Sequence, residues 1–369
     1  MTEASRRILR LALLALTIAC ALVIDLKGIL PRAVEGARNG DYSTFYAAGR
    51  IDRAKLYDFA AITKAQEPII GQVDSPRPYL NPPTYLFVLG PLARLPVNTG
   101  LAIWAGGTTL LFLAACLLVA RPPAVGLLLV SPVIWSTAAG GQVALLVGAC
   151  IIGGMALLER RPIIAGVLFA VAALIKPPAV TLVPLALIAC RQWRALAACL
   201  IAGVVGGLAS ISLYGLDIWL RWLGALHAFS AFLQFSDVVE KGSSPASLAR
   251  LAGLNGPMTL ALQVVCAILG VAIVWRVFRN SSQPLHRLAA LTTGCLLVTP
   301  YAMTQELAPM LPAAAVLLLS ARAHPLFWFA SFLVLASLAT PIGVILMGLG
   351  LLLLSWPSPE TIANGEASA

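Results

Sequence analysis

Long runs of leucine, alanine, valine and isoleucine make up most of this chain, and short polar or basic breaks separate them. The runs lack the alternation of a half-buried strand, and several approach the ~20 residues that a membrane-spanning helix needs. We therefore expect an all-α polytopic membrane protein with about 12 transmembrane helices, some of them short or broken. The predicted spans are residues 8–24, 97–119, 124–139, 144–158, two short helices within 163–189, 195–213, 258–275, 288–300, 307–319, 326–339 and 342–356.

The longest polar stretch follows the first span, and its core reads GDYSTFYAAGRIDRAKLYDFAAITKAQEPIIGQVDSPRPYLNPP. It gathers acidic residues, basic residues and tyrosines in a chain that is only 11% charged. The apolar segment at its end, residues 82–96, is too short to cross a bilayer and is expected to lie at the interface. A polar, aromatic loop on an apolar scaffold is where we expect the chemistry.

Basic residues in the short breaks between spans predict the topology, because short cytoplasmic loops are enriched in lysine and arginine. We therefore expect both termini to lie inside the cell and the long polar stretch to lie outside. The membrane is expected to be the cytoplasmic (inner) membrane. The formal charge of +10 is then a matter of topology and not of nucleic-acid binding. The first helix follows a basic start and is expected to stay uncleaved. The whole chain is expected to form a single membrane domain. Its parts are the first span (8–24), the outer catalytic loop (25–96), central helices (97–213), a second outer loop (214–255), C-terminal helices (256–356) and a cytoplasmic tail (357–369).

One long apolar run, residues 163–189, is interrupted at Lys176-Pro177-Pro178. Two prolines remove backbone donors and break a helix. Basic residues at both ends favour two short helices that form a hairpin, with Lys176 at its outer tip. The alternative is one long kinked span, which would place Arg191 and Arg194 outside.

Cysteine and histidine give no sign of a metal site or a disulfide. All seven cysteines lie within apolar runs, without CxxC pairing, and the three histidines share no ligand spacing. We expect no cofactor, and a requirement for a divalent metal stays open.

Asp41 and Asn81 each allow two interpretations. Asp41 stands before a segment with helical spacing, so it is either a helix N-cap, which the residues alone favour, or a general base at the membrane face. Asn81 is either a substrate-binding residue or a helix N-cap, because asparagine before a proline at the first helical position is a favoured helix start. Just before it, Arg77 and Tyr79 are expected either to bind phosphate or sugar hydroxyls or to anchor the loop at the headgroups.

Lys176 is costly in lipid, so it is expected either to hold a phosphate or to reach the outer headgroups. The remaining candidates for substrate binding are Tyr46 in the first outer loop, Gln142 in AAGGQVALL, and Gln305 and Glu306 in TPYAMTQELAP. Gly140 and Gly141 would let the backbone approach a ligand, although a glycine turn is also ordinary.

Five segments, in order, resemble glycosyltransferase family 87 of the GT-C superfamily, whose members are related to polyprenyl-phosphomannose-dependent mannosyltransferases. They are GDYSTFYAAG, KLYDFAAITKAQ, PYLNPPTYLFVLGPLARLP, GGQVALL and RRPIIAGVLFAVAALIKPP, and they cover about residues 40–190. The resemblance implies a GT-C-like fold, an acidic base at Asp41, and a lipid-linked donor whose phosphate lies near Lys176. The family often has His or Asp after a Ser/Thr-Pro near TPYAMTQE, where this chain has Gln305 and Glu306, so the acceptor is expected to differ.

These features predict an inverting glycosyltransferase that acts at the outer face of the membrane. It would transfer a hexose, with mannose expected, from a polyprenyl-phosphate donor to a glycolipid or glycan acceptor. The chain carries no glycine-rich phosphate loop for a nucleotide sugar. The alternative is a non-enzymatic transporter or flippase of lipid-linked sugars, for which paired charges on broken helices and inverted repeats are typical.

Overall fold

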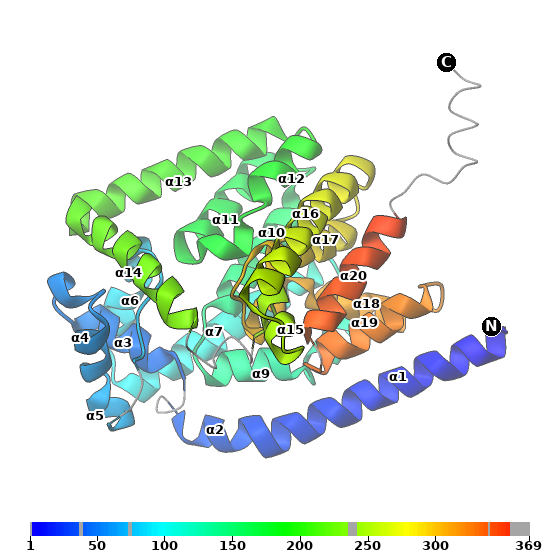
Figure 1. Cartoon of the computed structure of the whole chain (residues 1–369), viewed down its shortest axis with the longest axis horizontal. Coiled ribbons are helices and arrows are strands. Elements are labelled where there is room, and N and C mark those ends of the chain that lie inside the picture. The colour runs from blue at the N-terminus through cyan, green and yellow to red at the C-terminus, as the bar shows by residue number, and fades with distance from the viewer. Residues whose placement is uncertain (1, 37–39, 73–75, 235–241, 339, 355–369) are drawn as a thin grey trace.

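The computed structural model of the chain describes residues 2–36, 40–72, 76–234, 242–338 and 340–354. Regular structure in these residues is entirely helical, which confirms the predicted all-α class (Figure 1). The first half contains α1 (Glu3–Ile24), which continues as a π-helix (Asp25–Ile29), α2 (Leu30–Val34), α3 (Tyr42–Arg50), α4 (Phe59–Lys64), α5 (Glu67–Ile70), α6 (Leu86–Leu92), α7 (Val97–Leu117), α8 (Pro122–Leu128), α9 (Pro132–Ala139), α10 (Ala144–Leu157) and α11 (Pro162–Ile175).

The second half contains α12 (Val183–Ala189), α13 (Trp193–Tyr214), α14 (Leu216–Gln234), α15 (Pro245–Leu251), α16 (Gly256–Asn280), α17 (Pro284–Val298), α18 (Leu311–Leu319), α19 (Pro325–Leu335) and α20 (Thr340–Leu354). Short 3-10 helices cover Arg53–Lys55, Pro83–Tyr85, Pro177–Val180 and Thr304–Met310. The predicted tail at 357–369 lies outside the described residues.

The outside of the helical bundle is apolar. Along α13, five aliphatic side chains are each between 56% and 64% exposed: Leu200, Ile201, Val204, Val205 and Leu208. Soluble proteins rarely expose an apolar stripe of this extent, whereas a bilayer solvates it. The apolar helices therefore mark a multi-pass membrane protein.

The number of spans stays a prediction. Among the described residues, Glu3–Ile29, α7, α13 and α16 are long and apolar enough to cross a bilayer. Residues 124–139, predicted as one span, form α8 and α9, which are bent by 57° at a break where Pro132 cannot donate a backbone hydrogen bond. Eight further apolar helices have only 10–17 residues. The segment predicted as the second outer loop holds two helices, α14 and α15.

The chain reverses direction at Lys176, as the hairpin prediction requires. Gly166, early in α11, packs against the backbone of Ala195 at the start of α13, and Leu174, late in α11, packs against Gly206. The start of α11 therefore lies beside the start of α13, and the end of α11 lies beside the later part of α13, so the two helices run parallel. Two such parallel helices require the intervening segment, which contains α12, to run back in the opposite direction. The interpretation as one long kinked span is wrong.

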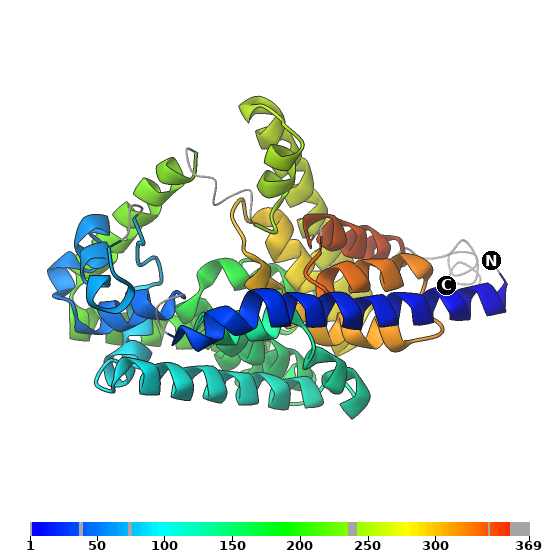
Figure 2. The same ribbon diagram turned by 90° about the horizontal axis from the view of Figure 1, so that it is seen from below.

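The basic breaks between helices gather at one end of the molecule. The Gln192 side chain donates a hydrogen bond to Glu159 (2.8 Å), and the buried Arg287 guanidinium pairs with the same carboxylate. Arg6 and Arg10 of α1 donate to backbone carbonyls of the α18–α19 connection. In Figure 1 the α12–α13 junction lies at the end of α13 that is away from α14. Figures 1 and 2 show the α18–α19 connection near the N-terminus and α3 to α6 at the opposite end, beside α14. The polar loop and the basic breaks are thus at opposite ends of the helices.

Candidate active site

The turn before α3 docks directly onto the turn between α9 and α10. The backbone N–H of Tyr42 donates to the carbonyl oxygen of Gly140 (3.1 Å), and a β-carbon on Gly40 would overlap the Gly140 backbone. Gly141 has φ +64°, a left-handed conformation that favours glycine, and its carbonyl accepts from the Trp104 indole (2.9 Å). Gly140 and Gly141 were predicted to let the backbone approach a ligand. In the structure they instead leave room for the turn formed by Gly40, Asp41 and Tyr42.

Asp41 occupies the N-cap position of α3 but does not cap it. Its side chain accepts no hydrogen bond from the first turn of the helix, so the interpretation as an N-cap is wrong. One carboxylate oxygen accepts from the Gln142 side-chain amide, which stands directly after the two glycines. By contrast, Asp58 caps α4 as expected of an aspartate, accepting from the Ala61 N–H (2.9 Å). The docking of the two turns therefore places the Asp41 carboxylate against the Gln142 amide, which holds it, and leaves it without a capping bond to α3.

The environment of Asp41 raises the pKa of its carboxyl group. Protein atoms surround the side chain although solvent still reaches it, and this desolvation raises its pKa above the ordinary value of 3.8. The Gln142 hydrogen bond and the positive charges of Lys176 and Arg77 act in the opposite direction. Desolvation prevails, which moves the pKa toward the range where a carboxylate accepts protons effectively.

Lys176 forms an ion pair with Glu306. The ammonium nitrogen lies 2.9 Å from a carboxylate oxygen, and the Lys176 side chain is 24% exposed against 8% for Glu306. Glu306 belongs to the 3-10 helix before α18, and Lys176 follows the last residue of α11. Tyr301, which precedes that 3-10 helix, has a raised pKa because of burial and the nearby negative charges of Asp41 and Glu306. These four side chains therefore lie within electrostatic reach of one another.

The NPPT segment holds the end of α11 that carries Lys176. The Asn81 amide donates to the Ile175 carbonyl (3.0 Å), and the Thr84 hydroxyl donates to the Leu174 carbonyl. The last carbonyls of a helix lack partners within it, so these bonds satisfy them and orient the following residue. Asn81 does not cap the 3-10 helix Pro83–Tyr85, whose N-cap position is Pro82; that interpretation is wrong.

Three other candidates serve the packing of the first loop. The Tyr46 hydroxyl donates to the Leu95 carbonyl (3.0 Å). Tyr79 is 1% exposed, with its ring packed edge-on against Phe45. The backbone of Arg77 is held by Thr63 and by Gln66, while its side chain acts on Asp41 only through its charge. Among the described contacts, none joins Tyr46 or Tyr79 to Asp41.

Gln305 stands beside Glu306 with its amide oxygen buried and without a hydrogen-bond partner among the described residues. A buried acceptor without a partner is costly, so a donor such as a substrate hydroxyl would be favoured there. Gln305 is thus a polar group available at the edge of the Lys176–Glu306 pair.

Gln66 organises the first loop, and the residue-by-residue interpretation missed it. Its buried amide oxygen accepts from Ser43 (3.2 Å) and Thr44 (2.8 Å) in α3, and its nitrogen donates to the Arg77 carbonyl (2.9 Å). The available signal was its place at the end of KLYDFAAITKAQ, where a polar residue follows an apolar helix. Gln66 thus connects α3, which follows Asp41, with the segment that contains Arg77.

Together, the fold and this cluster define a polytopic helical membrane protein with acidic, basic and amide side chains gathered at one end. The sequence pattern of glycosyltransferase family 87 matches residues 79–300, more than half of the chain, so the chain belongs to this family and is a glycosyltransferase. The matched region includes Lys176 and Gln142 but begins at Tyr79, after Asp41. Searches among curated proteins and among solved structures found no match.

Proposed function

We propose that this glycosyltransferase is an inverting enzyme that transfers a hexose, with mannose expected, from a polyprenyl-phosphate donor to a glycolipid or glycan. The reaction takes place at the outer face of the cytoplasmic membrane. The observation that carries the proposal is the Asp41 carboxylate, which is released from helix capping, held by Gln142, and close to the charges of Lys176 and Arg77.

Asp41 acts as the general base in this proposal. It accepts the proton of an acceptor hydroxyl while that oxygen attacks the anomeric carbon of the donor sugar. The bond between the anomeric carbon and the phosphate oxygen breaks, and polyprenyl phosphate leaves with the electron pair. One displacement of this kind inverts the anomeric configuration. Gln142 orients the carboxylate so that its proton-accepting oxygen is fixed before the acceptor arrives.

Lys176 stabilises the phosphate that leaves. Negative charge grows on the phosphate oxygens in the transition state, and a fixed ammonium group nearby lowers its energy. In the structure Glu306 neutralises Lys176, so a bound donor phosphate competes with Glu306 for the same ammonium group. Asn81, through Ile175, keeps Lys176 at the end of α11 and acts as a positioning residue.

Replacing Lys176 with glutamine is expected to lower kcat by about 10²-fold, because it removes one charge from the group that stabilises the leaving phosphate. Initial rates with a saturating polyprenyl-phosphate hexose would measure this. Lys64→Gln, at an exposed position in the same end of the molecule, is the matched control and should leave kcat unchanged. Equal rates for wild type and Lys176→Gln would show that Lys176 does not stabilise the leaving phosphate.

The pH dependence should follow the raised pKa of Asp41. A base must be ionised to work, so activity falls as pH drops through that pKa, at a higher pH than for an ordinary aspartate. Gln142→Leu removes the hydrogen bond that lowers this pKa, so the acidic midpoint of kcat/KM should move to higher pH. Gln192→Leu, which loses a bond to Glu159 at the other end, should leave the midpoint in place. A midpoint that moves to lower pH in Gln142→Leu contradicts this role.

Transport of lipid-linked sugars is the second candidate function. One observation favours it: Lys176 and Glu306 form an ion pair at breaks between helical segments, and such pairs are typical of transporters. The family assignment favours transfer of the sugar. In vesicles that contain the purified protein, a transporter moves the labelled lipid-linked sugar across the bilayer without changing it chemically.

The test of the proposed function uses membranes that contain the protein, which also supply the acceptor. Labelled hexose is offered on polyprenyl phosphate in one reaction and on a nucleotide in the other. We expect label to enter an acceptor from the lipid-linked donor and not from the nucleotide sugar when lipid-linked intermediates are depleted. Transfer from the nucleotide sugar alone would overturn the assignment of the donor.

A further inference from the structure

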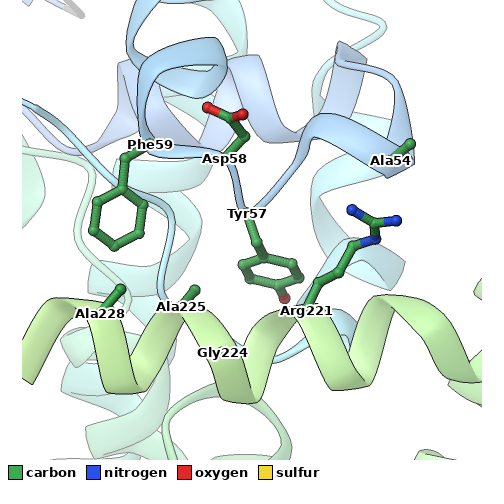
Figure 3. Close-up of a pocket in the computed structure, with 8 residues that line it drawn as sticks. All are labelled: Ala54, Tyr57, Asp58, Phe59, Arg221, Gly224, Ala225 and Ala228. Carbon is green, nitrogen blue, oxygen red and sulfur yellow. The ribbon is translucent and has the colours of Figure 1, made fainter.

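A groove of about 380 Å³ lies between the connection that precedes α4 and one face of α14 (Figure 3). Its volume falls within the ~300–1,000 Å³ of small-ligand sites in proteins. The groove does not include Asp41 or Lys176. Its lining residues are Ala54, Tyr57, Asp58 and Phe59 on one side and Arg221, Gly224, Ala225 and Ala228 of α14 on the other. None of the residues with a role in the proposed reaction lines it.

The two walls of the groove have different characters. On α14, Gly224, Ala225 and Ala228 fall within one helical turn and leave room because their side chains are small. Across from them, the rings of Tyr57 and Phe59 point toward α14, as Figure 3 shows. The result is a slot with two aromatic rings on one side and small side chains on the other. Tyr57 is 7% exposed and also packs against Tyr79, so Phe59 is the more accessible of the two rings.

Polar groups stand at the edge of this slot. Arg221 uses its Nε to pair with Asp217 (2.6 Å), and its guanidinium projects from α14 toward the opposite wall (Figure 3). Asp58 uses one carboxylate oxygen to cap α4. The groove thus presents one negatively charged residue, Asp58, and one positively charged residue, Arg221, which is already paired with Asp217. This balance of charges does not suit a doubly negative phosphate, which would call for unpaired cations.

The groove is tied to the proposed reaction centre by a chain of hydrogen bonds. The Tyr57 hydroxyl donates to the Asn81 carbonyl (2.8 Å), and the Asn81 amide donates to Ile175, next to Lys176. On the other wall, the Trp222 indole of α14 donates to the Leu80 carbonyl (3.0 Å). Both walls are therefore anchored to two consecutive backbone carbonyls, those of Leu80 and Asn81, just before the 3-10 helix Pro83–Tyr85.

From these observations we infer that the groove binds a neutral sugar unit of the acceptor. A pyranose ring has an apolar C–H face, which packs on aromatic rings, and a rim of hydroxyls, which hydrogen-bond with carboxylate and guanidinium groups. The slot offers both kinds of partner within one small volume. This inference rests on the proposed function, since it names the substrate class that the second substrate site takes.

Gly224→Leu is the variant that tests the groove. A β-carbon at Gly224 meets no atom within 4 Å, so leucine fits the helix and its branched end fills the slot. Arg221→Gln, at a half-exposed position, removes the guanidinium without leaving a cavity. Gly207→Leu on α13 is the matched control, because a β-carbon there also meets nothing within 4 Å and Gly207 does not line the groove.

The measurement is saturation-transfer NMR on the purified full chain in detergent, with methyl mannoside, methyl glucoside and methyl galactoside as probes and inorganic phosphate and a short polyprenol as competitors. We expect at least one glycoside to bind to wild type and Gly207→Leu, and its affinity to fall about tenfold or more in Gly224→Leu and Arg221→Gln. Phosphate should not displace it.

Equal glycoside binding in Gly224→Leu, no binding of any glycoside to wild type, or displacement by polyprenol would each overturn the groove as a sugar site. Because this readout needs no turnover, it is separate from the test of transfer. Groove-dependent binding without transfer from a lipid donor would reject the proposed reaction and keep the sugar site. Transfer without groove-dependent binding would do the reverse.

Discussion

Replacing Asp41 with asparagine is expected to slow sugar transfer by about 10²–10⁴-fold, the usual contribution of a general base. Asparagine keeps the shape of the side chain but cannot accept the acceptor's proton. Because the Asp41 side chain makes no capping bond to α3, the substitution should leave the helix intact. The measurement is the initial rate of label transfer from a polyprenyl-phosphate hexose by purified wild type and variant.

Asp52→Asn is the control for this prediction. Asp52 lies in the same loop, is exposed, and accepts a hydrogen bond from Ala54, which asparagine also accepts. We expect its rate to equal that of wild type. If Asp41→Asn elutes as a monodisperse protein and transfers sugar as fast as Asp52→Asn, then Asp41 is not the base.

Substituting alanine for Gly40 should damage the site through the backbone. The added β-carbon would overlap the backbone of Gly140, which cannot move aside as a flexible side chain can. The turn that carries Asp41 must then shift away from Gln142, and a displacement of about 1 Å from productive geometry costs about 10²-fold in rate. Overpacking of this kind also destabilises a fold by about 1–3 kcal/mol.

Gly106→Ala provides the comparison, because a β-carbon at this position of α7 meets nothing within 4 Å. Thermal unfolding and initial rates of both variants would be measured together. We expect Gly40→Ala to transfer sugar more slowly than Gly106→Ala even at a temperature where both variants remain folded. A fully active Gly40→Ala would show that the docking of the two turns does not position Asp41.

The architecture was predictable where it depends on local composition. Apolar runs predicted the helices. The two prolines after Lys176 predicted the break in residues 163–189, and the basic residues at both ends of that run predicted that the chain reverses there. Span number was less predictable, because several helices are shorter than a bilayer is thick and one pair is sharply bent. Residues 214–255 were predicted as an outer loop, whereas the structure forms α14 and α15 there.

The partners of the candidate site residues were not predictable from local sequence. Asp41 and Asn81 each stand at a favourable position for capping, but each side chain contacts a group about a hundred residues away. Lys176 likewise pairs with Glu306 across a similarly long separation. Local capping propensity is worth about 1 kcal/mol, so a single long-range hydrogen bond is enough to override it.

The configuration of the transferred sugar tests the central proposal most directly. Purified wild-type protein in lipid vesicles would be given a synthetic polyprenyl-phosphate hexose of defined anomeric configuration together with a membrane glycolipid extract. Proton NMR of the isolated product would then report the configuration at its anomeric carbon. Direct displacement assisted by Asp41 predicts inversion, with one polyprenyl phosphate released for each sugar transferred. Retention of configuration would contradict a single displacement and with it the role assigned to Asp41.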